Sequence, residues 1–112
     1  MIRALLLVLG LALACGAARA ADLTFPPLTG RVVDTAGILT DAQAERLDVL
    51  LAMHEKKTGQ QVVVATLKSL QGTTIEDYGY QLGRHWGIGQ KDKNTGALLI
   101  VAPAERKVRI EV

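Results

Sequence analysis

Two short apolar runs constrain the fold of this chain more than any other feature. QVVVATL spans residues 61–67, and ALLIVA spans residues 97–102. Neither run shows the apolar–polar alternation of a strand with one solvated face, so we expect both to be buried strands. The segment between them is long enough for the helical crossover that joins parallel neighbours. The two runs therefore predict an α/β fold.

A further strand is predicted at residues 107–112, which alternate in polarity. Val108, Ile110 and Val112 share one side of such a strand, and charged residues occupy the other side. The alternation predicts one buried and one solvated face, and the charged face is the one expected in solvent. Residues 103–106 supply the turn of a hairpin with residues 97–102. The sheet should thus be mixed, with parallel and antiparallel pairs.

The first predicted helix covers residues 41–58. Thr40 can cap its amino terminus, and Gln43, three residues later, completes a capping box. The apolar residues of this segment recur at the spacing of one helical face. The predicted stripe consists of Leu47, Leu50, Leu51 and His54.

The second predicted helix covers residues 75–86 and follows the capping residue Thr74. Gly79 and Gly83 lie inside it, where each glycine costs about 1 kcal/mol relative to alanine. We expect both glycines to let another element approach the helix closely. The elements together predict a small three-layer α/β/α sandwich with a mixed sheet. Because they would leave one sheet face poorly covered, we expect the fold to be truncated at its C-terminal edge, after Val112.

The first twenty residues have the pattern of a secretory signal peptide. Arg3 supplies a basic start, residues 4–14 are almost wholly apolar, and Ala18 and Ala20 form an A-x-A cleavage site. The apolar run is too short for a membrane-spanning helix, which needs about 20 residues. We therefore predict cleavage before Ala21 and export to the periplasm or cell envelope.

A second interpretation of the leader stays open. Residues 12–15 resemble a lipoprotein processing box, in which Cys15 would be lipidated and would tether the protein to a membrane. The third residue before the cysteine is normally leucine in such a box, and here it is Ala12.

Removal of the leader changes the charge of the chain. The whole sequence has 13 Lys and Arg against 11 Asp and Glu, a net charge of +2. Arg3 and Arg19 lie in the leader and no acidic residue does, so the mature chain is formally neutral. Nucleic-acid binding relies on excess clustered basic residues, so we do not expect it here.

The motifs of common enzymes are incomplete in this sequence. Ser69 stands in LKSLQG, which is not the nucleophile elbow of serine hydrolases. GIGQKD at residues 87–92 lacks the third glycine of the dinucleotide fingerprint and joins a helix to a strand. His54 and His85 occupy helical positions where packing or dipole contacts are expected. No recognisable catalytic set emerges, and whether the protein is an enzyme stays open.

Oxygen ligands are the remaining chemical option, and they would suit a hard cation. Asp34 lies in VVDTAG, where its carboxylate can cap a turn or serve a metal or catalytic site. Asp92 and Asn94 echo the start of an EF-hand loop, but Gly96 stands where that loop needs its fifth-position ligand. The EF-hand match therefore fails.

Four blocks of the mature chain together resemble the TPM domain family. They are VVDTAGILT at residues 32–40, TGQQVVVATLKSLQGTTIEDYG at 58–79, WGIGQKDKNTGALLIVA at 86–102 and RKVRIEV at 106–112. The resemblance covers nearly all of the mature chain.

The leader pattern and this resemblance together divide the sequence into three parts. Residues 1–20 are the expected signal peptide, residues 21–30 an entry linker, and residues 31–112 a TPM domain that is incomplete at its C-terminus. The family pattern implies an α/β/α sandwich that continues past Val112 with a further helix. Bacterial relatives often carry a transmembrane segment beyond the domain, which implies a membrane tether in the full-length protein.

The resemblance also implies site chemistry. Divalent ions such as calcium are associated with the fold, and Asp34, Asp92 and Asn94 are the metal ligands that would be carried over. Some plant relatives are described as acid phosphatases, which makes Asp34 the candidate catalytic residue.

Three alternative functions are therefore considered for this protein. The first is an accessory domain of the cell envelope that assembles or maintains membrane complexes through contacts with envelope or membrane proteins. The alternative is a divalent-metal-dependent, acid phosphatase-like enzyme, in which the cation would polarise a phosphoryl oxygen. A soluble secreted binding protein is the third.

Overall fold

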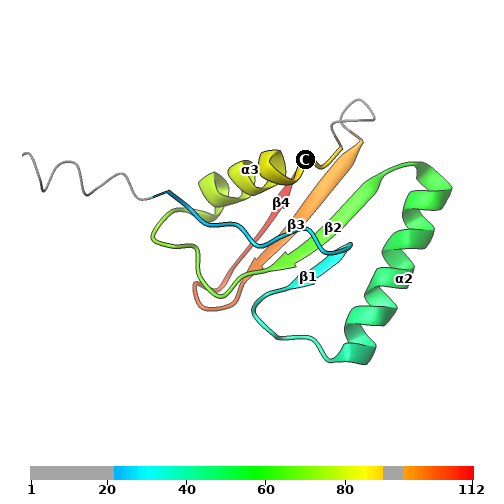
Figure 1. Cartoon of the computed structure of the whole chain (residues 1–112), viewed down its shortest axis with the longest axis horizontal. Coiled ribbons are helices and arrows are strands. Elements are labelled where there is room, and N and C mark those ends of the chain that lie inside the picture. Colours follow the sequence, from blue (N-terminus) through cyan, green and yellow to red (C-terminus); the bar gives the residue numbers. More distant parts are fainter. Residues whose placement is uncertain (1–21, 90–94) are drawn as a thin grey trace, which may run out of the picture.

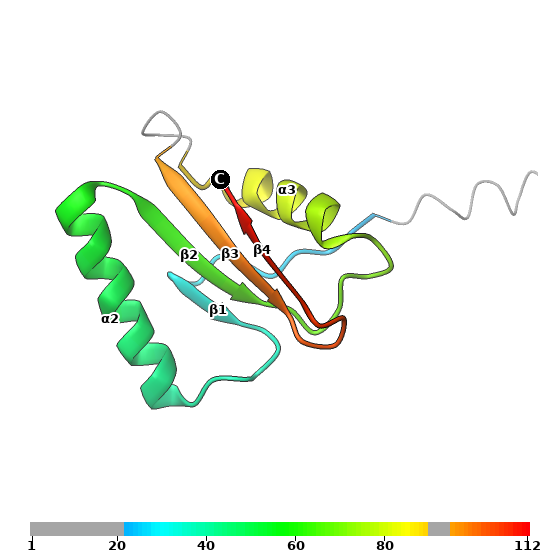
Figure 2. The ribbon, with the colours of Figure 1, turned by 180° about the vertical axis from the view of Figure 1, so that it is seen from behind.

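Strands and helices alternate along the described part of the chain, which comprises residues 22–89 and 95–112 of a computed structural model. The elements are β1 (Val32–Asp34), α2 (Asp41–Thr58), β2 (Gln61–Thr66), α3 (Ile75–Trp86), β3 (Gly96–Ala102) and β4 (Lys107–Glu111). In Figures 1 and 2, α2 lies beside β1 and β2, whereas α3 lies beside β3 and β4. The predicted α/β fold is confirmed. The leader, Asp92 and Asn94 lie outside the described residues.

The strands of the described residues form one mixed sheet in the order β1-β2-β3-β4. β1 pairs with β2 in parallel, and β2 pairs with β3 in parallel with Val63 opposite Leu98. β3 and β4 form an antiparallel hairpin with Ile100 opposite Arg109. The mixed pairing that the sequence predicts is therefore present.

The ends of α2 follow the local sequence. The Thr40 hydroxyl accepts a bond from the Gln43 N–H at 3.1 Å, and the Thr40 N–H donates to Gln43 Oε1 at 3.0 Å. Gly59 ends the helix in the left-handed region, with φ of 76°. Its N–H donates to the Glu55 carbonyl at 2.7 Å. Both helix boundaries agree with the prediction, because capping is a local interaction.

The apolar stripe predicted for α2 is partly wrong. Leu47 and Leu51 are half-buried, but Leu50 is 57% exposed and His54 is also exposed. Leu50 lies about 60° and His54 about 20° from Leu47, on the side away from Leu51 and outside the half-buried strip of the helix. No residue of α2 is fully buried, so this helix rests on β1 and β2 through a narrow strip.

The core lies between α3 and one face of β2 and β3. Its buried members are Val63, Ala65, Leu67, Leu70, Ile75, Tyr78, Leu82, Leu98, Ile100 and Ala102. The segment before β1, blue in Figures 1 and 2, runs across the sheet, and its Leu23 and Phe25 pack against this core. Trp86 also packs there, and its indole N–H donates to the Pro26 carbonyl at 2.8 Å.

Of the two glycines in α3, Gly79 makes the close approach that the sequence predicts. A Cβ atom at Gly79 would lie 2.5 Å from Ile100 Cδ1, well inside van der Waals contact. A Cβ atom at Gly83 would lie 3.8 Å from Glu111 Cγ, which is an ordinary contact distance. The prediction therefore holds for Gly79, whereas Gly83 has room for a methyl group.

The orientation of β4 is the reverse of the one predicted. Val108 is 64% exposed and Ile110 is 63% exposed, whereas Arg109 and Glu111 are half-buried. The hairpin register causes this reversal, because Arg109 pairs with Ile100, whose side chain faces α3. Arg109 and Glu111 form an ion pair at 2.9 Å in this position. Arg109 and Glu111 are thus partly covered, whereas Lys107, Val108 and Ile110 are exposed.

The glycine positions generate a matched pair of variants. Gly79→Ala is expected to lower the free energy of unfolding by about 1–3 kcal/mol, because the methyl group must displace the buried Ile100. Gly83→Ala is expected to leave stability unchanged or to raise it by up to about 1 kcal/mol through helix propensity. Urea unfolding of both variants measures the difference. Equal stability of the two would contradict the close contact at Gly79.

Candidate functional site at the carboxyl edge of the parallel strands

The sequence-predicted residue Asp34 lies where the parallel strands β1 and β2 end. Asp34 is the last residue of β1 and stands opposite Thr66, the last residue of β2. In open α/β sheets, ligands bind outside the carboxyl ends of the strands. Asp34 and Thr66 therefore lie at the edge of the sheet where a ligand is expected.

The carboxylate of Asp34 binds its own chain through both oxygens. Oδ1 accepts from Thr66 Oγ1 at 2.6 Å and from the Ile38 N–H at 3.1 Å. Oδ2 accepts from the Leu39 N–H at 2.9 Å. The Thr66 hydroxyl accepts in turn from the Ala36 N–H at 3.0 Å. Asp34 and Thr66 thus hold the turn before α2 against the end of β2.

These contacts also set the acidity of Asp34. Partial burial by itself raises the pKa of the carboxyl group. The hydrogen bonds from Thr66 and from the N–H groups of residues 37–39 favour the ionised form and outweigh burial. The net result is a pKa below the usual value for aspartate. Asp34 is therefore an ionised acceptor at neutral pH.

A cavity of about 290 Å³ adjoins this edge. It is lined by residues that follow β1 and β2, among them Thr35, Lys68 and Ser69, and by Tyr78 of α3. The segment before β1 forms one wall of it, where Gln71 exchanges two hydrogen bonds with the backbone of Thr24, at 2.8 and 2.9 Å. The Ser69 hydroxyl accepts from the Gln71 N–H at 2.8 Å, as expected of a turn residue.

The described residues include only one of the metal ligands that the family resemblance implies, Asp34. Asp92 and Asn94 lie outside residues 22–89 and 95–112. Within those ranges, no group of three or more histidine, cysteine or acidic side chains is placed to hold a metal ion. A cation at Asp34 would compete with the N–H and O–H donors already bound to its oxygens. The divalent-metal site stays a prediction.

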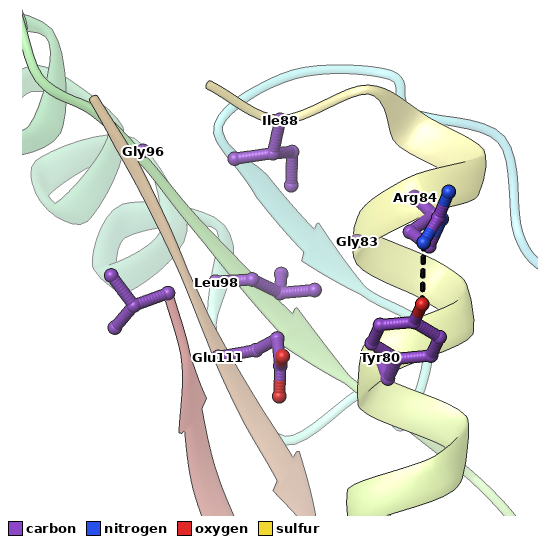
Figure 3. A pocket seen from close by; sticks show the side chains of 8 residues that line it. Tyr80, Gly83, Arg84, Ile88, Gly96, Leu98 and Glu111 are labelled. Atoms are coloured by element: carbon purple, nitrogen blue, oxygen red, sulfur yellow. Dashed lines mark hydrogen bonds between the residues drawn. The ribbon is translucent and has the colours of Figure 1, made fainter. Parts of the chain in front are cut away.

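A second cavity, of about 270 Å³, lies between α3 and the β3–β4 hairpin. Its lining includes Tyr80, Arg84, Leu98 and Glu111. Figure 3 shows Tyr80 and Arg84 one turn apart on α3, with Arg84 Nη1 donating to the Tyr80 hydroxyl. Sequence reasoning missed this cavity because it placed the charged face of β4 in solvent. The four-residue spacing of Tyr80 and Arg84 was the available signal.

Within residues 22–89 and 95–112, neither helix is long and apolar enough to cross a membrane.

The fold and this edge define a small α/β domain with three parallel strands, an antiparallel hairpin and an acidic residue at the carboxyl edge. The model of the TPM domain family matches residues 32–112. The chain belongs to the TPM domain family. No curated protein matches the chain.

Two solved structures are similar to this chain. The N-terminal domain of a protein from P. gingivalis is 34% identical, with a TM-score of 0.68, and the match covers 75% of this chain and 54% of that one. The N-terminal domain of a protein from Corynebacterium glutamicum is 19% identical, with a TM-score of 0.63, over 82% of this chain and 60% of that one. The second likeness concerns the fold alone. The chain spans less than two thirds of each solved domain.

The role of Asp34 predicts a pH-dependent loss of stability. Asp34→Ala is expected to cost about 1–2 kcal/mol at pH 7, the usual range for a capping acceptor. Because folding lowers the pKa of Asp34, its stabilisation is full above the unfolded value near 3.9 and is lost as pH falls through the folded value. The wild type should therefore lose its advantage over the variant below about pH 4.

Urea unfolding of the wild type and of Asp34→Ala between pH 7 and pH 2 measures this effect. Asp22→Ala, which removes an exposed carboxylate from the segment before β1, is the control and should show no comparable gap. A constant gap between wild type and Asp34→Ala across the whole range would show that the ionised carboxylate does not hold the turn.

Proposed function

We propose that this chain is an exported TPM-domain protein of the cell envelope that acts as an accessory domain in the assembly or maintenance of membrane complexes. The proposal rests on the hydrogen bonds that the Asp34 carboxylate accepts. Its two carboxylate oxygens accept hydrogen bonds from Thr66, Ile38 and Leu39. The candidate catalytic residue is thus engaged in holding a turn.

The hydrogen bonds matter because a carboxylate has a limited number of acceptor positions. An ionised aspartate offers about four lone-pair sites. Three hydrogen bonds at 2.6–3.1 Å occupy most of them. A nucleophile, a general base or a metal ligand needs a lone pair directed at its substrate or ion. The geometry at Asp34 supports a positioning role, which suits a domain that works by presenting a fixed surface.

The exported location is supported by the sequence of residues 1–20 and gives a prediction of its own. Purified from its native cells, the protein is expected to begin at Ala21 by mass spectrometry. A lipidated Cys15 at the N-terminus would instead show that the protein is tethered at this end. A retained Met1 in the envelope-free fraction would contradict export.

A metal-dependent phosphatase-like activity is the second candidate. It is favoured by the position of Asp34 at the carboxyl edge, beside the cavity lined by Lys68 and Ser69. In such an enzyme, a cation would polarise a phosphoryl oxygen and position water. The ion would then have to use the remaining acceptor position of Asp34 or displace one of its present donors.

One complementation experiment separates the two candidates. Cells that lack the protein are supplied with the wild type or with Asp34→Asn, which keeps the shape of the side chain. We expect both to restore the amount of membrane complexes seen on native gels, and we expect equal background phosphatase rates with and without calcium. Circular dichroism confirms that the variant is folded.

Two results would contradict the proposed function. Membrane complexes that are unchanged in cells without the protein would remove the accessory role. A folded Asp34→Asn variant that fails to restore the complexes, together with a metal-dependent phosphatase rate lost in that variant, would favour the enzyme.

A further inference from the structure

The cavity beside the carboxyl edge of β1 and β2 has a volume of about 290 Å³. All of its lining residues lie between positions 24 and 78. They come from the segment before β1, from Thr35 after β1, from the residues that follow β2, and from Tyr78 of α3. Pockets for drug-sized ligands have volumes from about 300 Å³ upward, so this cavity suits a small molecule or a single residue.

Part of the lining is apolar and well packed. Leu67 and Tyr78 are 2% and 1% exposed. The Phe25 ring meets the Tyr78 ring edge to face, with the two ring centroids 5.3 Å apart. Pro26 lies beside them in the lining. These side chains offer a preformed surface to an apolar group.

Some polar groups of the lining are engaged within the protein. Gln71 uses both ends of its side-chain amide on the backbone of Thr24. The Tyr78 hydroxyl donates to the Thr24 carbonyl at 2.9 Å. The Ser69 oxygen accepts from the Gln71 N–H at 2.8 Å. Because a serine hydroxyl also carries one proton, Ser69 can still donate that proton to a ligand.

The other polar groups of the lining have no partner in the protein. Lys68 is the one charged residue in the lining, and its ammonium group has no ion-pair or hydrogen-bond partner among the described residues. The Thr35 hydroxyl likewise has none within residues 22–89 and 95–112. No carboxylate stands among the described lining residues. The groups that a ligand can use are therefore hydrogen-bond donors, and one of them is a cation.

We propose that this cavity binds a carboxylate carried on a small apolar group, such as N-acetyl-leucine or the last residue of a polypeptide. The Lys68 ammonium and the Ser69 hydroxyl bind the carboxylate through charge-assisted hydrogen bonds. The apolar surface of Phe25, Pro26 and Leu67 takes the side chain. Capture of a C-terminal carboxylate is a recurring mode of peptide recognition.

The charges around the cavity favour a carboxylate over a phosphate. A single ammonium group balances a single negative charge, whereas a phosphate group carries about −1.5 to −2 at pH 7. Asp34 precedes Thr35 in the chain and is ionised at neutral pH, so it adds negative charge near the cavity. A second negative charge on the ligand would be repelled. The proposed ligand thus differs from the substrate of the phosphatase-like candidate.

The first test is a nuclear magnetic resonance titration of the purified protein with N-acetyl-leucine at pH 7. We expect saturable shifts at the amides of Lys68, Ser69 and Gln71, with a dissociation constant of about 1 mM, as suits a small ligand. N-acetyl-leucinamide has nearly the same shape without the charge and should bind at least about tenfold more weakly. Acetate, which lacks the apolar group, and inorganic phosphate should also bind more weakly.

Variants of Lys68 test the cation itself. Lys68→Met keeps the apolar stem and removes the charge, so it is expected to raise the dissociation constant of N-acetyl-leucine at least about tenfold. Lys68→Arg keeps the charge and should retain binding. Lys56→Met, which removes an exposed lysine of α2 outside the lining, is the matched control and should leave binding unchanged. Far-UV circular dichroism checks that all three variants fold.

A pair of peptides distinguishes the two sources of the carboxylate. An N-acetylated pentapeptide that ends in leucine is compared with the same peptide carrying a C-terminal amide. Binding of the acid at least about tenfold tighter than N-acetyl-leucine would assign the cavity to polypeptide ends. Equal binding of the acid and of N-acetyl-leucine would assign it to a small carboxylic acid or a lone terminal residue.

Four outcomes would overturn the proposal. They are the absence of a saturable shift up to about 10 mM N-acetyl-leucine, equal binding of N-acetyl-leucine and its amide, unchanged binding in Lys68→Met, and tighter binding of phosphate than of N-acetyl-leucine. None of them bears on export or on the amount of membrane complexes in cells. The accessory role and the carboxylate site can therefore fail separately.

Discussion

The packing of α3 on the sheet depends on the close contact of Gly79 with Ile100. This contact lets α3 lie close against β3, where Ile100 is completely buried. With α3 in that place, the hairpin register turns Arg109 and Glu111 toward the helix and turns Val108 and Ile110 outward. The same register places Glu111 in the lining of the cavity beside Tyr80. The register of the hairpin therefore determines which side chains of β4 face α3.

A second constraint operates at the carboxyl edge of β1 and β2. Asp34 and Thr66 tie the turn before α2 to the end of β2, and this tie matters because α2 has no fully buried residue of its own. Helices in proteins gain most of their stability from packing, so a loosely packed helix depends more on its ends. The capping box at Thr40, the left-handed Gly59 and the Asp34 turn supply those ends. Asp34 therefore links the candidate site to the stability of the fold.

Elements determined by neighbouring residues were predictable. The capping box at Thr40 and the cap at Thr74 were read from the sequence, because each depends on residues three positions apart. The buried strands followed from unbroken apolar runs, and the position of Asp34 after Val33 led to the correct edge of the sheet. The donors to its carboxylate were not predictable, because Thr66 lies 32 residues away. The cavity between α3 and the hairpin was not predictable for the same reason, because its lining residues are far apart in the sequence.

The sequence by itself determined the class of fold, the ends of both helices and the pairing of residues 97–102 with 107–111, since periodicity and caps are short-range signals. Tertiary structure decided which side of each amphipathic element meets the core. Leu50 and Val108 are apolar, yet both are exposed. Leu50 lies outside the strip of α2 that meets the sheet, and the hairpin register turns Val108 away from α3. An alternating strand specifies two different faces, but it does not specify which of them a helix will cover.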